Sequence, residues 1–375
     1  MQIESGRSAF NRDVVQRTAL LLLPVAILIF GTLYSFYDVD RRSSIGSITH
    51  KERVIVHQQQ KHFTRVFNNI VSDLLVLTSH ADFTEMLNDS DNDLARHLYN
   101  ISHEFLSFID HKGIYDQLRF INMKGQEIIR IDLNDGSPRI ITKEKLQNKS
   151  ERYYFTKTAA LRSHEVYISP FDLNIENGAV ERPLKPMLRV AIPIIDQSDV
   201  RHGIIILNYL GDYLLNELKA IGANSSGRTL VLNADGYWLK GLHKSDEWGF
   251  IFPNKKGRTF QSRYPDEWER ISSEESGNLI SEHGLFTYTT VKPLYRGWKS
   301  ASGNYRAYLP EEGDKDISNY SWKVVSFISA EELQAESERL ATPMLILSII
   351  LTIVWGMYAL ISSIARVQKK MHKTS

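Results

Sequence analysis

The chain has 375 residues, a formal net charge of +1 and no cysteine. The lack of cysteine excludes disulfide bonds, cysteine-ligated zinc and a cysteine nucleophile, and a total charge this close to zero does not indicate a nucleic-acid partner. Charged residues make up 24% of the sequence, which is typical of a chain whose bulk folds in water. A chain of this length is expected to form two or three folded units.

Near each end lies an apolar stretch without a charged residue, at 18–37 and at 343–364. Because about 20 helical residues cross the roughly 30 Å hydrocarbon core of a bilayer, we expect transmembrane helices at 18–38 and 341–364. A cleaved signal peptide is the alternative for the first stretch, but the apolar run is long for one and no small-x-small cleavage site follows it.

The residues that flank these two stretches predict the orientation. Basic residues precede the first stretch and follow the second: Arg7, Arg12, Arg17, Arg366, Lys369, Lys370 and Lys373. Basic flanks remain in the cytoplasm, so the tails 1–17 and 365–375 are expected there. The part of the chain between the two stretches is then extracytoplasmic.

A long signalling helix is predicted for residues 39–88, and a second helix for 93–110. The apolar residues of the long helix recur at steps of three and four and form one face: Phe63, Val66, Phe67, Ile70, Leu74 and Leu77. Such a face serves either packing within the chain or a parallel homodimer, and we expect a homodimer. A helix that continues directly from a membrane span is able to transmit a shift or a rotation.

Two α+β units with largely antiparallel sheets are predicted next, at 89–222 and 223–335. The elements expected in the first are a hairpin at 115–132 that turns at Lys124-Gly125, a short helix at 151–161, strands at 165–174, 186–196 and 203–210, and a helix at 211–222. Those expected in the second are a hairpin at 227–242, a helix at 265–275 and strands at 284–294 and 321–329, with 310–319 as a polar loop. Five tryptophans are expected to fill the core of the second unit: Trp238, Trp248, Trp268, Trp298 and Trp322.

Motifs for metal binding or catalysis are incomplete. The stretch "DSDND" at 89–93 resembles the start of a calcium loop, but Leu94 replaces the required glycine and Asn100 the required glutamate. The stretch "HEFLS" at 103–107 lacks the second histidine of a zinc protease, and no Gly-x-Ser-x-Gly elbow occurs. We therefore expect no metal, no cofactor and no catalysis, because the alternative of an anchored enzyme lacks an acid, base and nucleophile cluster.

Several stretches together resemble one known family over roughly residues 40–335: "ERYYF", "VYISPFDLNIENGAVERPLKPMLRVAIPI", "GIIILNYLGDYLL", "NADGYWLKG", "DEWGF" and "YPDEW". The arrangement resembles the double Cache, or tandem PAS-like, extracytoplasmic sensor domain of bacterial membrane receptors, as found on diguanylate cyclases and histidine kinases. The resemblance implies two PAS-like modules on the long helix, of which the membrane-distal one binds a small molecule and the membrane-proximal one relays the signal. It also implies a two-pass protein of the bacterial inner membrane with a periplasmic main domain.

Receptors of this kind continue after their second membrane span into an output domain, whereas this sequence ends at "RVQKKMHKTS". We expect either a truncated receptor or one that signals through a separate membrane or cytoplasmic partner. An alternative function is an interaction protein that docks a periplasmic binding protein or a partner membrane kinase or cyclase. A deep pocket would favour direct sensing over docking.

The resemblance also suggests ligand-binding residues. Arg152 and Tyr154 fall where related amino-acid receptors place an arginine and an aromatic residue that hold the ligand's carboxylate, and a guanidinium binds a carboxylate in bidentate fashion. Phe155 stands where such receptors have a hydrogen-bonding tyrosine, and Lys157 stands near an expected acid. A carboxylate-bearing ligand is therefore expected, while an amino acid fits the pattern incompletely.

Further candidates flank the polar run 170–182. Asp172 is placed to hold an amine, and Tyr167, Ser169 and Arg189 alternate along the flanking strands toward the same cavity. Asp172 and Arg189 each have a structural alternative. Asp172 and Asn174 are typical turn caps, and Glu176 or Glu181 would make a salt-bridge partner for Arg189. The run then covers a ligand pocket, holds two strands together, or does both.

Overall fold

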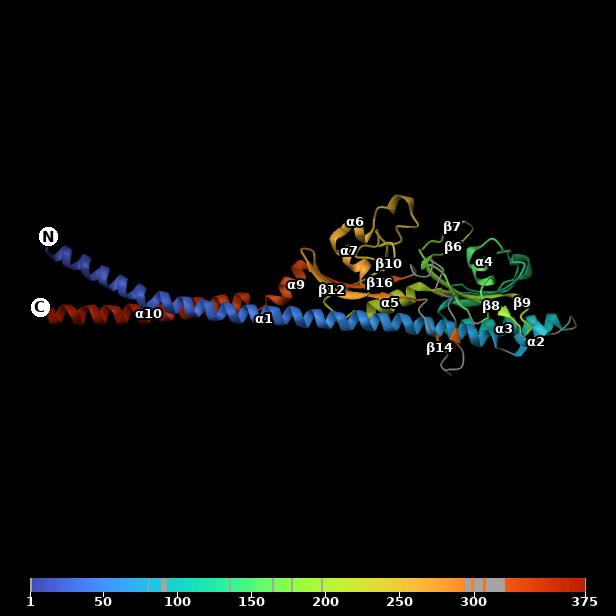
Figure 1. Ribbon diagram of the computed structural model, residues 1–375, viewed down its shortest axis with the longest axis horizontal. Helices are drawn as coiled ribbons and strands as arrows, with labels where there is room; N and C mark the ends of the chain where they lie inside the picture. Colours follow the sequence, from blue (N-terminus) through green and yellow to red (C-terminus); the bar gives the residue numbers. More distant parts are fainter. Residues whose placement is uncertain are drawn as a thin grey trace. The chain divides into compact units, whose positions relative to one another are not determined.

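The computed structural model (Figure 1) describes residues 2–374 except 80, 89–92, 135, 164, 177, 197, 294–297, 300–305 and 308–320. The predicted loop 310–319 and most of the calcium-like stretch 89–93 thus lie outside the described residues. The chain divides into two compact units. One comprises residues 1–51, 282–284 and 329–375, and the other comprises 52–281 and 285–328.

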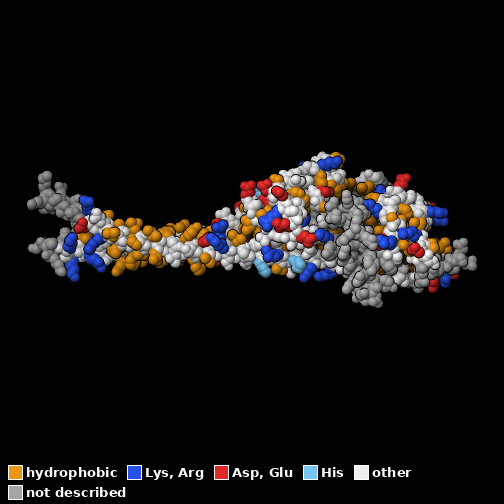
Figure 2. All heavy atoms as spheres, in the orientation of Figure 1, with side chains coloured by type: hydrophobic (Ala, Val, Ile, Leu, Met, Phe, Trp, Pro, Cys, Tyr) orange, Lys and Arg blue, Asp and Glu red, His pale blue; other side chains and the backbone are white. Residues whose placement is uncertain are grey.

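The helices of the first unit are the start of α1 (Gln2–Thr78), α9 (Ala330–Ser337) and α10 (Ala341–Thr374). A capping box begins α9, because Ser329 Oγ accepts from the Glu332 amide and the Glu332 side chain accepts from the Ser329 amide. Both α1 and α10 contain a stretch long and apolar enough to cross a membrane, and Figure 2 shows hydrophobic side chains covering them there. The indole of Trp355 on α10 donates to the Leu21 carbonyl at 3.0 Å.

Helix α1 ends ten residues earlier than predicted for the long helix, and a separate helix α2 (Ala81–Asn88) follows. No proline or glycine marks the break. The hydroxyls of Thr78 and Ser79 instead donate to the carbonyls of Leu75 and Val76, at 3.0 Å each. Such side-chain bonds to the preceding turn compete with continued helix, so the prediction of one helix to residue 88 is wrong.

The first sheet of the second unit has seven strands: β1 (Tyr115–Asn122), β2 (Glu127–Asn134), β3 (Ser137–Ile140), β4 (Tyr167–Ile168), β5 (Asp172–Leu173), β8 (Pro186–Ile195) and β9 (Arg201–Leu210). Their order is β3-β2-β1-β9-β8-β4, with β5 paired to β8. The hairpin β1–β2 turns at Gly125, which has the positive φ of +75° predicted for a turn glycine. The expected strand at 165–174 is interrupted at Pro170, which cannot donate to a ladder.

The second sheet has five strands: β10 (Arg228–Asn233), β11 (Trp238–Lys240), β12 (Ser276–Ser281), β13 (Gly284–Val291) and β16 (Trp322–Ser329). Their order is β11-β10-β16-β13-β12. The two sheets share this order. If β3 and β5 are set aside and the remaining strands of each sheet are numbered along the chain, both β2-β1-β9-β8-β4 and β11-β10-β16-β13-β12 read second, first, fifth, fourth, third. Two short ribbons, β6 (Ile175–Glu176) with β7 (Ala179–Val180) and β14 (Trp298–Lys299) with β15 (Arg306–Ala307), lie off the sheets.

Helices and short 3-10 turns complete the unit: α3 (Leu94–Lys112), α4 (Tyr153–Ala159), α5 (Gly211–Ile221), α6 (Phe260–Arg263), α7 (Pro265–Ser273), η1 (Lys143–Lys145) and η2 (Pro253–Lys255). Within this unit, α1 lies along one side of the sheets, and α4, α6 and α7 lie on the other (Figure 1). The chain is therefore α+β with a long N-terminal helix and antiparallel sheets, as predicted.

The predicted apolar face of α1 packs inside this one chain. All six of its residues are at most 9% exposed and belong to one cluster with the first sheet and α3. Leu118 and Phe120 of β1 and Leu188 and Val190 of β8 contribute to that cluster. Burial of this face against the chain's own sheet removes the observation that motivated a homodimer through it.

Tryptophans of the second sheet's segment divide between two clusters. Trp238 and Trp268 belong to the core of the second sheet. Trp248 and Trp322 belong instead to the large cluster built around α1 and the first sheet, and the side chain of Trp298 lies outside the described residues. The expectation that all five fill one core is wrong, because two of them connect the sheets.

Candidate functional site

The face of the first sheet that points away from α1 is part apolar and part polar. Ile121, Ala191, Ile204 and Ile206 form a small cluster there with Tyr154 and Phe155 of α4. Beside it, the register aligns Arg189 of β8 with Asn208 of β9, and Asn208 with Gln117 of β1. Arg119 follows Gln117 by two positions on the same face and stands opposite Arg130 of β2.

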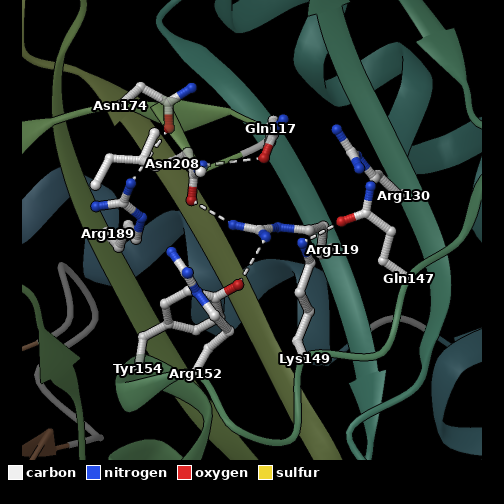
Figure 3. Close-up of a pocket in the computed structure, with 12 residues that line it drawn as sticks. Gln117, Arg119, Arg130, Gln147, Lys149, Arg152, Tyr154, Asn174, Arg189 and Asn208 are labelled. Atoms are coloured by element: carbon white, nitrogen blue, oxygen red, sulfur yellow. Dashed lines mark hydrogen bonds between the residues drawn. The ribbon is translucent and has the colours of Figure 1, made fainter. Parts of the chain in front are cut away.

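These side chains line a cavity of about 200 Å³. The residues that line it are Gln117, Arg119, Arg130, Gln147, Lys149, Arg152, Tyr154, Asn174, Ile175, Gly178, Arg189 and Asn208. Figure 3 shows Lys149, Arg152 and Tyr154 reaching from the loop and α4 toward Arg119 and Asn208 on the sheet. Five of the lining residues are cationic and none is acidic, so the cavity is suited to an anion.

Arg119 lies at the centre of this cavity (Figure 3) and is only 4% exposed. Its guanidinium donates to Asn208 Oδ1 at 2.8 Å and to the Tyr154 hydroxyl at 3.2 Å, and its Nη1 lies 3.8 Å from Glu127 Oε1. Asn208 in turn donates to Gln117 Oε1 at 3.1 Å. These contacts hold Arg119 in one position from three strands and one helix, so the site is preorganised.

Arg189 is held by a carboxylate outside the cavity lining. Its guanidinium donates to Asp172 Oδ1 at 2.8 Å and to Asn174 Oδ1 at 3.2 Å. The Tyr153 hydroxyl donates to the other Asp172 oxygen at 3.3 Å. Burial raises the pKa of the Asp172 carboxyl, and the neighbouring Arg189 guanidinium opposes that rise.

Two of the cations lack a carboxylate. The guanidinium of Arg152 lies 5.8 Å from the centre of the Tyr154 ring and has no hydrogen-bond or ion-pair partner among the described residues. Lys149 Nζ donates to the Gln147 side chain. Burial lowers the pKa of Lys149; Tyr154 and Glu127 oppose this effect, and Arg119 and Arg130 add to it. Positive charge is therefore in excess on the loop side of the cavity.

Of the predicted ligand-binding residues, Arg152, Tyr154 and Arg189 line this cavity. Ser169 does not, since its hydroxyl donates to the Pro170 carbonyl and accepts from the Arg189 amide, which fixes β4 against β8. Tyr167 also lies outside the lining and packs on the small apolar cluster. The six predicted residues are thus brought to one region, but only half of them reach the cavity.

The contacts of Asp172 decide between its alternatives. The carboxylate accepts from Arg189 instead of capping its own turn, and that ion pair occupies the oxygen that an amine would need. The proposed partners of Arg189 are also corrected. Glu181 pairs with Lys185 at 2.9 Å, and the side chain of Glu176 lies outside the described residues.

Sequence reasoning missed the floor of the cavity: Gln117, Arg119, Arg130 and Asn208. A signal was present. Gln117 and Arg119 alternate with Leu118 and Phe120 in a strand that is buried almost throughout, and polar residues at such positions need a partner or a ligand. Among the described residues, no group of histidine, aspartate and glutamate is arranged to hold a metal ion.

A model of the family described as bacterial histidine kinase, sensor domain, matches residues 51–297 of the chain. No curated protein matches the chain. Among solved structures, the extracellular domain assigned to the histidine kinase vpHK1S-Z8 is similar over 78% of this chain and 98% of its own, with a TM-score of 0.63 and 20% identity. A domain assigned to a sensory box/GGDEF family protein from Vibrio parahaemolyticus is similar over 79% and 99%, with a TM-score of 0.59 and 22% identity. At these identities the two likenesses show a shared fold.

Proposed function

The chain belongs to the family of bacterial histidine kinase sensor domains, and on this premise we propose that it is a membrane-anchored receptor that binds a small anion on its first sheet and relays the binding through α1. The observation that carries the proposal is the cavity lined by five cations and no acid. A family of sensor domains has a non-catalytic role, which agrees with a preorganised binding site. A preformed cavity favours direct sensing over docking of a binding protein.

The anchoring part of the proposal rests on the two apolar helices. α1 and α10 each have a stretch that is long and apolar enough to span a bilayer. With basic residues at both outer flanks, the two-pass arrangement with cytoplasmic tails follows from the positive-inside rule. The main domain then lies in the periplasm of a bacterial inner-membrane protein.

The modular part of the proposal rests on the repeated strand order. We assign 89–222 as the ligand-binding module and 223–335 as the relay module, because each contains one sheet of the shared order. The polar cavity belongs to the first sheet. The second sheet has an aromatic core in the corresponding place, which suits transmission better than binding.

A row of aromatic rings supports a relay from the site to α1. Phe171 precedes the Asp172 that holds Arg189, and its ring lies 5.5 Å from that of Trp248 and 5.9 Å from that of Trp322. Trp322 lies 5.5 Å from the ring of Phe67 on α1. Because close-packed rings cannot move independently, a shift of Arg189 on ligand binding is expected to displace α1.

Binding by the full-length chain in lipid nanodiscs tests the proposal. Isothermal titrations with acetate, butyrate, succinate, citrate, sulfate and phosphate are expected to show one or more anions that bind. A hydrogen bond to a charged group contributes about 1.5–3 kcal/mol, so Arg152→Ala, which removes an exposed arginine of the lining, is expected to weaken that binding by about tenfold or more. Arg139→Ala, which removes an exposed arginine on β3, is the matched control. Equal affinity of Arg152→Ala and the parent would place the site elsewhere.

A further inference from the structure

The charges around the cavity do not balance. Each carboxylate that pairs with a lining cation among the described residues is already engaged. Glu127 lies 3.8 Å from Arg119 and 3.9 Å from Arg130, Asp132 lies 2.7 Å from Arg130, and Asp172 lies 2.8 Å from Arg189. These three carboxylates pair with Arg119, Arg130 and Arg189, so the two other lining cations have no carboxylate within ion-pair distance among the described residues.

The excess positive charge lies on two residues. Lys149 and Arg152 are the two lining cations without a carboxylate, and both reach toward Arg119 in Figure 3. Arg119 itself keeps a donor free, because its buried Nε has no hydrogen-bond partner among the described residues. A buried donor without a partner destabilises the protein. The cavity thus presents two cations without a paired carboxylate and one unsatisfied donor, all of which an anion would satisfy.

An ammonium group finds no carboxylate among the residues that line this cavity. No acidic side chain lines the cavity, and Asp172, the carboxylate suggested for an amine, is committed to Arg189. An amino acid would place its own cation among the five of the protein. Like charges at such short distances repel even at the effective dielectric constant of a partly exposed site.

The volume sets the size of the ligand. A cavity of about 200 Å³ is smaller than the roughly 300–1,000 Å³ of clefts that hold drug-sized molecules. The lining is polar almost throughout, with Gln117, Asn174 and Asn208 beside the cations. Such a lining fits a small and strongly hydrated solute, which exchanges bonds with water for bonds with the site.

We propose that the ligand of this site is a small anion with two or more negative charges and no ammonium group, such as a short dicarboxylate, sulfate or phosphate. The inference rests on the proposed function and makes it specific. One charge faces Arg152 and the other faces Lys149, with Arg119 Nε donating between them. Both remaining cations are then neutralised by one molecule.

A matched series of four-carbon compounds tests how many negative charges the ligand carries. Succinate has two carboxylates, butyrate has one, and 4-aminobutyrate has one carboxylate and one ammonium. The full-length chain in nanodiscs is titrated with each at constant ionic strength, because salt screens the charges. Succinate is expected to bind at least about tenfold more tightly than butyrate, and 4-aminobutyrate is expected to bind most weakly. Sulfate, phosphate and citrate titrated in parallel separate inorganic dianions from carboxylates.

Variants then locate the dianion. Lys149→Gln is expected to weaken the binding of succinate, or of the dianion that binds best, by at least about tenfold. The affinity of the variant for the dianion should then be close to its affinity for the monoanion. Lys149→Gln is also expected to raise the unfolding temperature of the protein without added anion, because it removes a charge that is half-buried beside other cations. Lys145→Gln, in the exposed turn η1, is the control and is expected to change neither quantity.

The outcomes separate the two levels of inference. If butyrate or 4-aminobutyrate binds as tightly as succinate and the binding requires Arg152, the receptor proposal stands and the dianion is wrong. If no compound of any valence binds at millimolar concentration, both are overturned. If a dianion binds but Lys149→Gln and Arg152→Ala leave its affinity unchanged, the dianion occupies another site and the inference fails.

Discussion

The two sheets of the extracytoplasmic part share one strand order but differ in what covers the face opposite α1. On the first sheet, that face has Gln117, Arg119, Arg189 and Asn208 around a cavity. On the second sheet, the corresponding face is filled by rings and aliphatic side chains: Leu230, Leu232, Trp238, Phe260, Tyr264, Trp268, Phe286, Tyr288, Val325 and Phe327. The strand order therefore sets the frame, and the side chains on one face decide between a binding site and a core.

The difference is also one of interaction type. The first sheet's face is stabilised by ion pairs and hydrogen bonds that depend on each partner, whereas the second depends on close packing. Substitution of an unpaired cation at the first sheet's cavity should act mainly on binding, whereas substitution in the ion pairs around that cavity or in the second core should act mainly on stability. The predictions below test this contrast from the largest expected effect to the smallest.

Phe286→Ala is expected to destabilise the protein most. Phe286 is fully buried, and its ring lies 4.6 Å from Phe327 and 5.3 Å from Tyr264. Truncation leaves a cavity in a ring cluster and costs about 3–5 kcal/mol, to be measured by urea unfolding of the full chain in detergent. Ile280→Ala, on exposed β12, is the control and should change stability by less than about 0.5 kcal/mol. A loss below about 1 kcal/mol for Phe286→Ala would show that the second core tolerates voids.

Asp172→Leu is expected to have a smaller effect of about 3 kcal/mol, because it leaves the buried Arg189 without its counter-charge. The double variant Asp172→Leu with Arg189→Met should recover much of that loss, since both charges are gone. A double-mutant cycle measured by urea unfolding gives the coupling. Additive losses in the double variant would mean that the pair does not hold the loop.

Gly211→Ala tests the aromatic row. A Cβ at this position would lie 2.2 Å from Phe171 Cε2 and 2.5 Å from Cζ, so the ring must move. We expect a loss of about 1–3 kcal/mol from overpacking, together with weaker coupling between anion binding and the fluorescence of Trp322 and Trp248. Gly257→Ala, where a Cβ meets nothing within 4 Å, is the control. Unchanged ligand-dependent fluorescence in Gly211→Ala would exclude Phe171 from the relay.

Lys323 on β16 gives the smallest effect, visible as a pH dependence. Burial lowers the pKa of Lys323 to about 8, from an ordinary value of 10.5. Between these two values the unfolded chain binds more protons than the folded one, so the free energy of unfolding rises with pH. Lys323→Met should remove this rise, which unfolding curves between the two pKa values can measure against the parent protein. A slope that is identical in both proteins would show that Lys323 is not the group that titrates.

Local sequence patterns were sufficient to predict several helices and turns of the fold. Charge-free runs indicated the two apolar helices, the three- and four-residue spacing indicated the buried face of α1, and Lys124-Gly125 indicated a hairpin turn. Each of these signals lies within a few residues of the feature that it specifies. The end of α1 at Thr78 was missed, because hydroxyl groups stopped the helix where no proline or glycine did.

The site was predicted only in part for a related reason. Arg152 and Tyr154 belong to one short helix and its cap, so a single motif revealed them. Gln117 and Asn208 meet through pairing of β1 with β9, across a separation of 91 residues, and no local pattern gives that register. The ion pair of Asp172 was missed although Arg189 is only 17 residues away, because the two side chains meet through the pairing of β5 with β8.

The shared strand order gives the chain a particular evolvability. Two sheets of one order in one chain are what duplication of an ancestral unit produces, with one copy later filled by rings and the other kept open. Because most substitutions destabilise a protein and folding must stay above a threshold, a densely packed copy supplies a reserve of stability. Side chains at the floor of the open copy, such as Gln117 and Asn208, are then free to diverge. The chemistry of this face can in this way change while the strand order that supports it is kept.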